Sequence, residues 1–363
     1  MSYQPGHMGL AEGMALIFAA TLAPVFLTTF PFSVDTAGPL AWSAPIISYL
    51  EFIILLYPLL YVMRHSAQDL YGACRELLGE WPTRLIAFYY VTLYLLDAVL
   101  LLRQFAENTL ITALPALEFE AAIILYGIMA LILLYIGIES LAQTSYILMP
   151  LLIIGLLLIL ALASSRYNFL FLTPWNGTGL VTVGFWGVRA GGINLGALLP
   201  FFLATSFQNR RTLKNAVVYG LGLSALLRTA AFVCYTAAFG ASISREKLLP
   251  FYELARLVYL SRFVQRIEAF FIIVWSIMGM INIAIDIFAA LYLLCRLFNL
   301  PALRPLMLPM VMIVGELAML PPAVTEVVVI YITALFSYYN IGTLVIPLIL
   351  FCAALLRKWR EAA

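Results

Sequence analysis

The sequence has few charged residues, and this shortage restricts what kind of protein it encodes. Only 10% of its 363 residues are Asp, Glu, Lys or Arg, whereas 64% are hydrophobic. Soluble domains carry about a quarter charged residues. The formal net charge of +2 offers no basic surface for nucleic acid. The composition therefore predicts an all-α polytopic membrane protein with the lipid bilayer as its solvent and no nucleic-acid partner.

Histidine and cysteine are also scarce, which argues against metal and nucleophilic chemistry. The two histidines, His7 and His65, lie outside the apolar segments, so they provide no proton relay within the membrane and disfavour a zinc site. The four cysteines are scattered, and this pattern predicts neither a disulfide framework nor a metal site. No GxxxxGK[ST] or GxGxxG loop occurs, and no nucleophilic triad can be built without histidine in the fold. We therefore predict no enzyme activity, no cofactor and no metal.

Apolar segments of about 20 residues, the length that crosses a bilayer, divide the chain into ten predicted helices. They cover residues 10–32, 41–63, 83–113, 120–137, 143–163, 188–207, 213–240, 262–297, 305–321 and 326–357. A modest excess of Arg and Lys in the loops on one side places both termini in the cytoplasm. We expect a single transmembrane domain over residues 1–363. Five helices per half imply an inverted 5+5 repeat, residues 10–163 and 188–357.

The sixth predicted helix contains residues that a plain membrane helix avoids. The stretch GGINLGALLP, Gly191–Pro200, combines three glycines, an asparagine and a proline. Gly costs about 1 kcal/mol and Pro about 3 kcal/mol in a helix interior. Backbone groups freed in hydrocarbon need partners within the protein or a water-filled cavity. We interpret this stretch as a broken helix, with Gly191, Gly192, Asn194 and Gly196 as candidate ligand-binding residues.

A matching interruption occurs in the first predicted helix, where Pro24 lies near the middle and Thr21 and Thr28 offer side-chain oxygens. Two broken helices at corresponding places in two halves indicate a transporter-type binding site near the bilayer midplane. The alternative interpretation is simple proline kinks and close helix packing through Gly192 and Gly196. Both interruptions fall in the first helix of a half, which favours the binding site.

Ionisable side chains within the predicted membrane helices are costly and are functional candidates for that reason. They are Glu51, Asp97, Arg103, Glu107, Arg228, Asp286 and Glu316. Arg103 and Glu107 are four residues apart and can pair, and Arg103 can also bridge to Asp97. Together with Glu51 and Asp286 they form either a buried structural network or a functional site. In the functional site one carboxylate, Asp97 first, takes a proton or a substrate ammonium.

Trp275 and Ser276, about two turns into the eighth predicted helix, are candidate pocket residues, although a membrane tryptophan more often serves packing.

Two loops carry helical patterns. Residues 65–84 alternate apolar and charged side chains up to Gly79, which predicts an amphipathic surface helix. Pro250 is expected to open a short helix that brings Glu253 and Arg256 to pairing distance.

Five stretches of the sequence together form a recognisable pattern. They are LPFYELARLVYLSRFVQRIEAFFIIVW at Leu249–Trp275, LLGEWP at Leu77–Pro82, RQFAE at Arg103–Glu107, ESLAQTSYILMP at Glu139–Pro150 and RRTLKNA at Arg210–Ala216. This pattern resembles the spore germination B subunits (GerAB-like spore permeases), the membrane component of GerA-type germinant receptors. Only the first stretch is specific by itself.

The resemblance implies the LeuT-like fold of the amino acid-polyamine-organocation (APC) superfamily, with a pocket between the first, third, sixth and eighth helices. Carried over by position, the pocket residues are Thr21, Ala23, Pro24, Gly192, Asn194 and Gly196. The chain departs from the family pattern twice. Pro24 stands where glycine is common, and the stretch from Asn194 lacks an acidic residue often found there. Both departures lie in the implied pocket, so the ligand need not be L-alanine.

The resemblance also implies a function and a location. It implies a germinant receptor subunit in the spore inner membrane that binds a small germinant, an amino acid or a sugar, and acts with receptor A and C subunits. The sequence leaves two other functions open. One is a stand-alone proton-coupled amino-acid permease, and the other is a channel or scaffold part of the germination complex.

Overall fold

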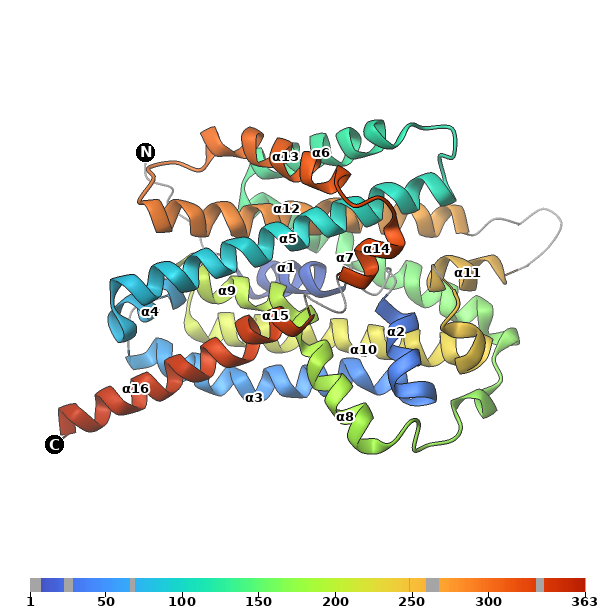
Figure 1. Ribbon diagram of the computed structural model, residues 1–363, viewed down its shortest axis with the longest axis horizontal. Helices are drawn as coiled ribbons and strands as arrows, with labels where there is room; N and C mark the ends of the chain where they lie inside the picture. The colour runs from blue at the N-terminus through green and yellow to red at the C-terminus, as the bar shows by residue number, and fades with distance from the viewer. Residues whose placement is uncertain are drawn as a thin grey trace.

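The computed structural model is a bundle of α-helices joined by 3-10 and π-helical turns (Figure 1). It describes residues 8–22, 29–65, 69–247, 249–258, 268–330 and 336–362, and every structural statement below concerns these ranges. Figure 1 shows most helices running along the long axis of the molecule. Helix α4 (Leu70–Leu78) lies at one end of the bundle and α11 (Pro250–Arg256) at the other.

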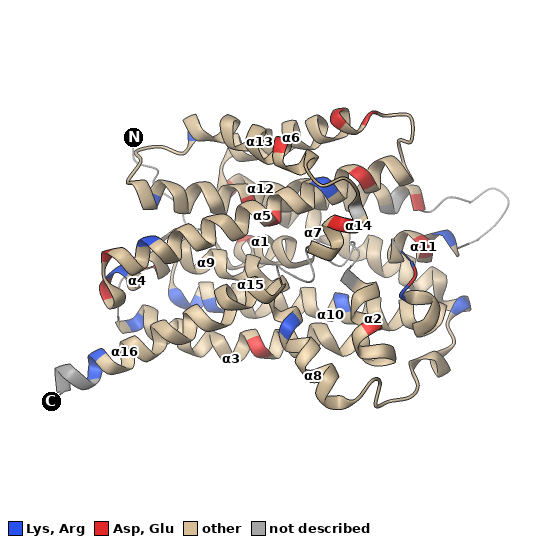
Figure 2. Ribbon diagram, viewed as in Figure 1, with Lys and Arg blue, Asp and Glu red and all other residues tan. Residues whose placement is uncertain are grey.

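Seven helical spans among the described residues are long and apolar enough to cross a membrane, and α1 (Leu10–Leu22) is a shorter apolar helix. The spans are Phe30–His65, Glu80–Thr112, Phe119–Ile136, Ile138–Arg166, Arg210–Ser244, Ile272–Phe298 and Phe336–Lys358. Figure 2 shows groups of charged residues at both ends of the bundle and scattered charged residues between them. The chain is therefore an integral membrane protein, as its composition predicts.

The first part of the chain follows the predicted helices except between the first and the second. Residues 33–40, expected as a connection, are helical and continue into the second helix, so Phe30–His65 is one helical span. The elements of this part are α1, α2 (Thr29–Ala37), η2 (Gly38–Ser43), α3 (Ala44–His65), α4, α5 (Glu80–Thr112), α6 (Phe119–Ile136) and α7 (Ile138–Leu162). Helix α7 begins earlier than the predicted residue 143. The reason is Gly137, whose φ of 89° turns the chain directly from α6 into α7. Residues 23–28, which include Ala23, Pro24 and Thr28, lie outside the described residues.

The second part departs further from the predicted boundaries. Its elements are η3 (Ala163–Arg166), η4 (Phe169–Leu172), α8 (Leu180–Arg189), η5 (Ala190–Leu198), α9 (Leu199–Phe202), η6 (Ala204–Ser206), α10 (Arg210–Ser244), α11, α12 (Glu268–Phe298), α13 (Arg304–Met319), α14 (Val324–Ile330), α15 (Phe336–Asn340), η8 (Ile341–Val345) and α16 (Ile346–Ala362). The sixth segment starts at Leu180 rather than at residue 188. The last predicted helix contains a π-helical turn between α15 and α16, and these elements together form the span Phe336–Lys358.

The two loops with helical patterns fold as predicted. Asp69 caps α4 by accepting a hydrogen bond from the backbone N–H of Gly72 at 2.7 Å, a contact worth about 1 kcal/mol. Gly79, with φ 86°, ends the helix. In the other loop Pro250 opens α11, and Arg256 lies 3.9 Å from the Glu253 carboxylate.

The buried face of α4 leads to a prediction about thiol reactivity. Cys74 is 2% exposed, and burial raises its pKa to about 12, so almost no thiolate forms at neutral pH. A variant that keeps Cys74 as its only cysteine is expected to react with N-ethylmaleimide at least about tenfold faster after unfolding than in the folded state. Equal rates in both states would contradict the packing of α4.

The sixth segment lies at the centre of the bundle. Its η5 stretch packs against α1, α3 and α15, while α5 and α12 form an extensive helix pair nearby. The chain after η6 is tied to the start of α1. The Met8 N–H donates to the Ser206 carbonyl at 2.6 Å, and the Gln208 N–H donates to the Met8 carbonyl at 3.4 Å. The two segments predicted to be broken therefore lie side by side.

Candidate functional site

The sixth segment is interrupted where its glycines and proline predicted a break. Helix α8 ends at Arg189, and the chain continues as 3-10 turns in which Asn194 has non-helical angles, φ −87° and ψ 17°. The α-helix resumes at Leu199, with Pro200 in its first turn, where a missing N–H costs no hydrogen bond. The break leaves backbone groups that need partners in the protein interior.

The glycines of η5 allow neighbouring elements to approach its backbone. A Cβ added to Gly196 would lie 2.6 Å from the Cβ of Ala20 in α1, and one added to Gly192 would lie 2.9 Å from a backbone oxygen of α15. A Cβ on Gly191 would collide with the carboxylate of Glu51 in α3. These separations are shorter than van der Waals contact. The three glycines therefore provide close packing on three sides of the break, and their expected ligand contacts stay a prediction.

Asn194 connects the break to two other helices. Its Oδ1 accepts a hydrogen bond from Nη2 of Arg228 in α10 at 3.0 Å, and its Nδ2 donates to the carbonyl oxygen of Ser48 in α3 at 3.2 Å. The exposed fraction is 0% for Asn194 and 1% for Arg228. Buried polar contacts of this kind hold a segment in one position, because breaking them leaves polar groups without solvent. The pair thus holds the non-helical point of η5 against α3 and α10.

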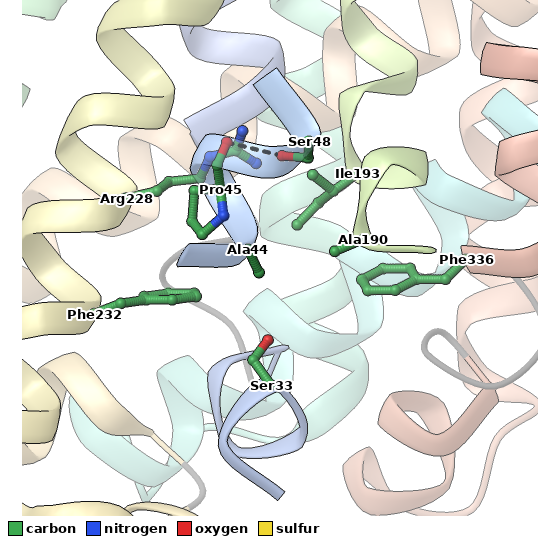
Figure 3. Close-up of a pocket in the computed structure, with 9 residues that line it drawn as sticks. All are labelled: Ser33, Ala44, Pro45, Ser48, Ala190, Ile193, Arg228, Phe232 and Phe336. Atoms are coloured by element: carbon green, nitrogen blue, oxygen red, sulfur yellow. Dashed lines mark hydrogen bonds between the residues drawn. The ribbon is translucent and has the colours of Figure 1, made fainter. Parts of the chain in front are cut away.

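A small cavity of about 20 Å³, room for about one water molecule, lies beside this hydrogen-bonded chain (Figure 3). Its lining comes from α2, α3, η5, α10 and α15, and consists of Ser33, Ala44, Pro45, Ser48, Ala190, Ile193, Arg228, Phe232 and Phe336. Figure 3 shows the rings of Phe232 and Phe336 on opposite sides of the space and Ser33 at one end. An apolar wall with a few converging polar groups is the kind of lining found in small-molecule sites. The elements around this space must move apart before anything larger than water fits.

A second buried polar cluster joins α5, α12 and α15. Tyr339 donates its hydroxyl to Oδ1 of Asp97 at 2.9 Å. The side chain of Asp97 also makes a hydrogen bond with that of Asp286, and the two residues are 8% and 2% exposed. One turn before Asp97 on α5, Tyr94 donates to the Leu195 carbonyl oxygen at 3.1 Å. The aspartate pair and the break in the sixth segment are therefore linked through α5.

The charged residues expected to form one network lie in three separate places. Arg103 pairs with Glu107 at 3.0 Å, donates to the Pro322 carbonyl at 3.3 Å and stacks 4.0 Å from the ring centre of Phe119. Glu51 lies against the break, and the two aspartates lie between α5 and α12. In the part of the chain that the structure describes, no group of three or more His, Cys, Asp or Glu is placed to hold a metal ion.

Trp275 and Ser276 lie away from the aspartate pair. The ring of Trp275 is 5.2 Å from that of Phe105, and Ser276 makes a hydrogen bond with Tyr126 of α6. Phe105 is eight residues beyond Asp97, which is about 12 Å along α5. The contacts of both residues are thus with α5 and α6 at another level of the bundle. A pocket role for them stays a prediction.

Thr21, at the end of α1, is fully buried and donates its hydroxyl to the carbonyl oxygen of Ile17 at 2.8 Å. This bond within α1 satisfies the hydroxyl group locally. Its neighbours in the sequence-based set, Ala23, Pro24 and Thr28, lie outside the described residues. Of the four pocket residues expected from the first broken helix, Thr21 is therefore the one that the structure describes.

Sequence reasoning missed the tyrosines and gave no role to Arg228. Tyr90, Tyr94 and Asp97 recur at the spacing of one helix face, so the sequence does contain a signal for the tyrosines. Tyr90 donates to the Gly342 carbonyl oxygen in η8 at 2.6 Å. Arg228 stood out as a charge within the membrane, but its partner is 34 residues away in the sequence and no local pattern predicts that contact.

Comparisons with known proteins identify a family and a fold. The family model for spore germination proteins (Spore_permease) matches residues 9–327. Similar solved structures include MhsT in complex with L-phenylalanine, at TM-score 0.65 and 15% identity, with 98% of this chain and 99% of that chain covered. A substrate-bound, outward-open Na+-coupled sialic acid symporter has TM-score 0.62 and 13% identity, with 93% and 76% covered.

A manganese transporter of Eremococcus coleocola in complex with an aromatic bis-isothiourea compound has TM-score 0.60 and 13% identity, with 98% of this chain and 79% of that chain covered. No match to a curated protein sequence was found. At such low identities the likeness shows the fold alone. That fold is the one shared by LeuT-like and APC transporters.

Proposed function

This chain belongs to the spore germination protein family and has a transporter-type membrane fold, and from this premise we propose that it is a germinant receptor subunit. It binds a small germinant, an amino acid, beside the broken sixth segment and passes a conformational change to partner subunits. Family and fold are those of transporters and receptors rather than of enzymes. The proposal adds the ligand, the site and the signalling role.

The observation that carries the proposal is the position of Asn194, which is held between Arg228 and Ser48, two residues that line the cavity. A ligand in the cavity that bonds to Arg228 competes with the contact that holds η5 against α10. Binding therefore changes the relative free energies of two arrangements of η5. Such differential affinity is what a receptor needs in order to signal.

The lining favours an amino acid over a sugar. The guanidinium of Arg228 is buried at the cavity and matches the geometry of a carboxylate. The aromatic and aliphatic walls suit a small apolar side chain. A sugar would depend instead on Asn194, Ser33 and the faces of Phe232 and Phe336.

The proposal includes the arrangement expected from the sequence. The chain forms a single transmembrane domain of ten helices with repeats over residues 10–163 and 188–357, and both termini face the cytoplasm. It works in the spore inner membrane with receptor A and C subunits, which read the movement of the sixth segment. The first broken helix supplies Thr21, Ala23, Pro24 and Thr28 to the ligand site.

A binding and exchange experiment tests the function. The full chain is reconstituted alone, in nanodiscs for thermal unfolding and in proteoliposomes for counterflow of a labelled mixture of neutral amino acids. We expect the mixture to raise the unfolding midpoint without saturable exchange. Asn194→Leu should remove the rise, whereas Asn108→Leu, a matched change at another buried amide, should keep it. A folded chain with neither a rise nor exchange would contradict the proposal.

A second candidate function is a stand-alone proton-coupled amino-acid permease. The buried carboxyl groups of Asp97 and Asp286 favour it, because ionisable groups inside a membrane are typical of proton pathways. In the same proteoliposomes, saturable counterflow that an imposed pH gradient accelerates would support the permease. In that case the receptor function would depend on a working transport cycle.

A further inference from the structure

Two carboxyl groups meet between α5 and α12, in the middle of the bundle. Asp97 and Asp286 make a side-chain hydrogen bond although neither ionised carboxylate has a hydrogen to donate. One proton must therefore lie on the pair for the contact to exist. Like charges this close and this buried cannot both stay ionised.

The groups around the pair indicate which of the two aspartates carries the proton. The Tyr339 hydroxyl donates to Oδ1 of Asp97 at 2.9 Å, which stabilises Asp97 as the carboxylate that accepts. Tyr94 on α5 also lies close to both aspartates. It donates its own hydroxyl elsewhere, to Leu195. Asp286 is therefore the partner that carries the hydrogen.

A second observation on α12 also points to a bound proton. Oδ2 of Asp286 and Oδ1 of Asn282 are buried acceptors without a hydrogen-bond partner in the described part of the chain. They lie four residues apart, on one face of the helix. A proton on Asp286 supplies a donor that can serve Asp97 on one side or Asn282 on the other.

The pair is linked to the break in the sixth segment by two contacts. Tyr94, on the same face of α5 as Asp97, holds the Leu195 carbonyl of η5. Tyr339, bonded to Asp97, packs against the backbone of η5 at Gly192. Both contacts reach η5 from the α5 side of the aspartate pair.

We propose that Asp97 and Asp286 form a binding site for one proton, which holds α5 against α12 beside the broken sixth segment. In the protonated state Asp286 O–H donates to the Asp97 carboxylate, and the site carries one negative charge. When the proton leaves to solvent, two carboxylates remain and repel each other. This repulsion weakens the packing of α5 against α12. The proposal concerns the chain without ligand, so it goes beyond germinant binding.

Infrared difference spectroscopy on the full chain in nanodiscs, without ligand, tests the site. The spectrum of the wild type at neutral pH minus that of Asp97→Asn/Asp286→Asn is expected to show one protonated carboxyl band and one carboxylate band. The protonated band should shift in D2O. Two carboxylate bands, or two protonated bands, would overturn the shared proton. Glu316→Gln, a carboxyl change on α13, should leave both bands in place.

Thermal unfolding across pH gives an independent readout. The wild-type midpoint should fall as pH rises, because loss of the proton brings two like charges together. Asp286→Asn should be insensitive over the same range, because its amide donates permanently to Asp97. An Asp286→Asn variant with the pH dependence of the wild type would contradict the proposal. Neither measurement uses a germinant, so failure here is distinct from failure of ligand binding.

Discussion

Replacement of Gly196 by alanine is expected to destabilise the folded chain by about 1–3 kcal/mol, the usual cost of overpacking. The new Cβ would lie 2.6 Å from the Cβ of Ala20 and 2.8 Å from its carbonyl oxygen. The oxygen belongs to the backbone of α1, so no side-chain rotation relieves the contact. Helix α1 in turn packs on α7 and α10, so its displacement disturbs these helices too.

The measurement is the thermal midpoint of purified protein, with Gly184→Ala as the matched control. Gly184 lies in α8 with no atom within 4 Å of an added Cβ, so alanine there should leave the midpoint unchanged or raise it. Ala20→Gly in the Gly196→Ala background removes one of the two close contacts and should restore part of the loss. A Gly196→Ala midpoint at or above that of the wild type would refute the close approach of α1 and η5.

The features predicted correctly from the sequence are those with a local physical cause. The break at Gly191–Pro200 follows from helix propensity, and α4 follows from an amphipathic pattern that ends at Gly79. The pairing of Arg103 with Glu107 follows from their spacing of four residues. Each depends on residues within one or two helical turns, and such short-range geometry is nearly independent of the rest of the fold.

The contacts that build the candidate site were not predictable in this way. Tyr339 reaches Asp97 across 242 residues of sequence, and Asn194 reaches Ser48 across 146. Which helix faces which is decided by packing over the whole bundle, and a single sequence carries no local record of it. The same reason explains why the expected charge network lies in three places. The i to i+4 rule relates Arg103 to Glu107, but it says nothing about Asp286 on α12.

Loss of the Arg228 side chain is expected to have the second large effect. Arg228→Leu leaves Oδ1 of the buried Asn194 without this donor, which costs about 1–3 kcal/mol. The substitution also removes the buried cation from the cavity wall, so the rise in midpoint caused by neutral amino acids should disappear. Arg228→Lys keeps the charge but loses the planar fork and should restore the rise only in part.

A double-mutant cycle separates the contact itself from general damage to α10. Asn194→Leu and Arg228→Leu each remove one partner, and their combination removes both, so the combined loss should be smaller than the sum by about 0.5–3 kcal/mol. Asn194→Leu combined with Glu316→Gln, which changes a residue of α13, should be additive. Additivity in the first cycle would mean that Arg228 does not hold η5. In that case the cavity would lose the contact by which a ligand is proposed to move the broken segment.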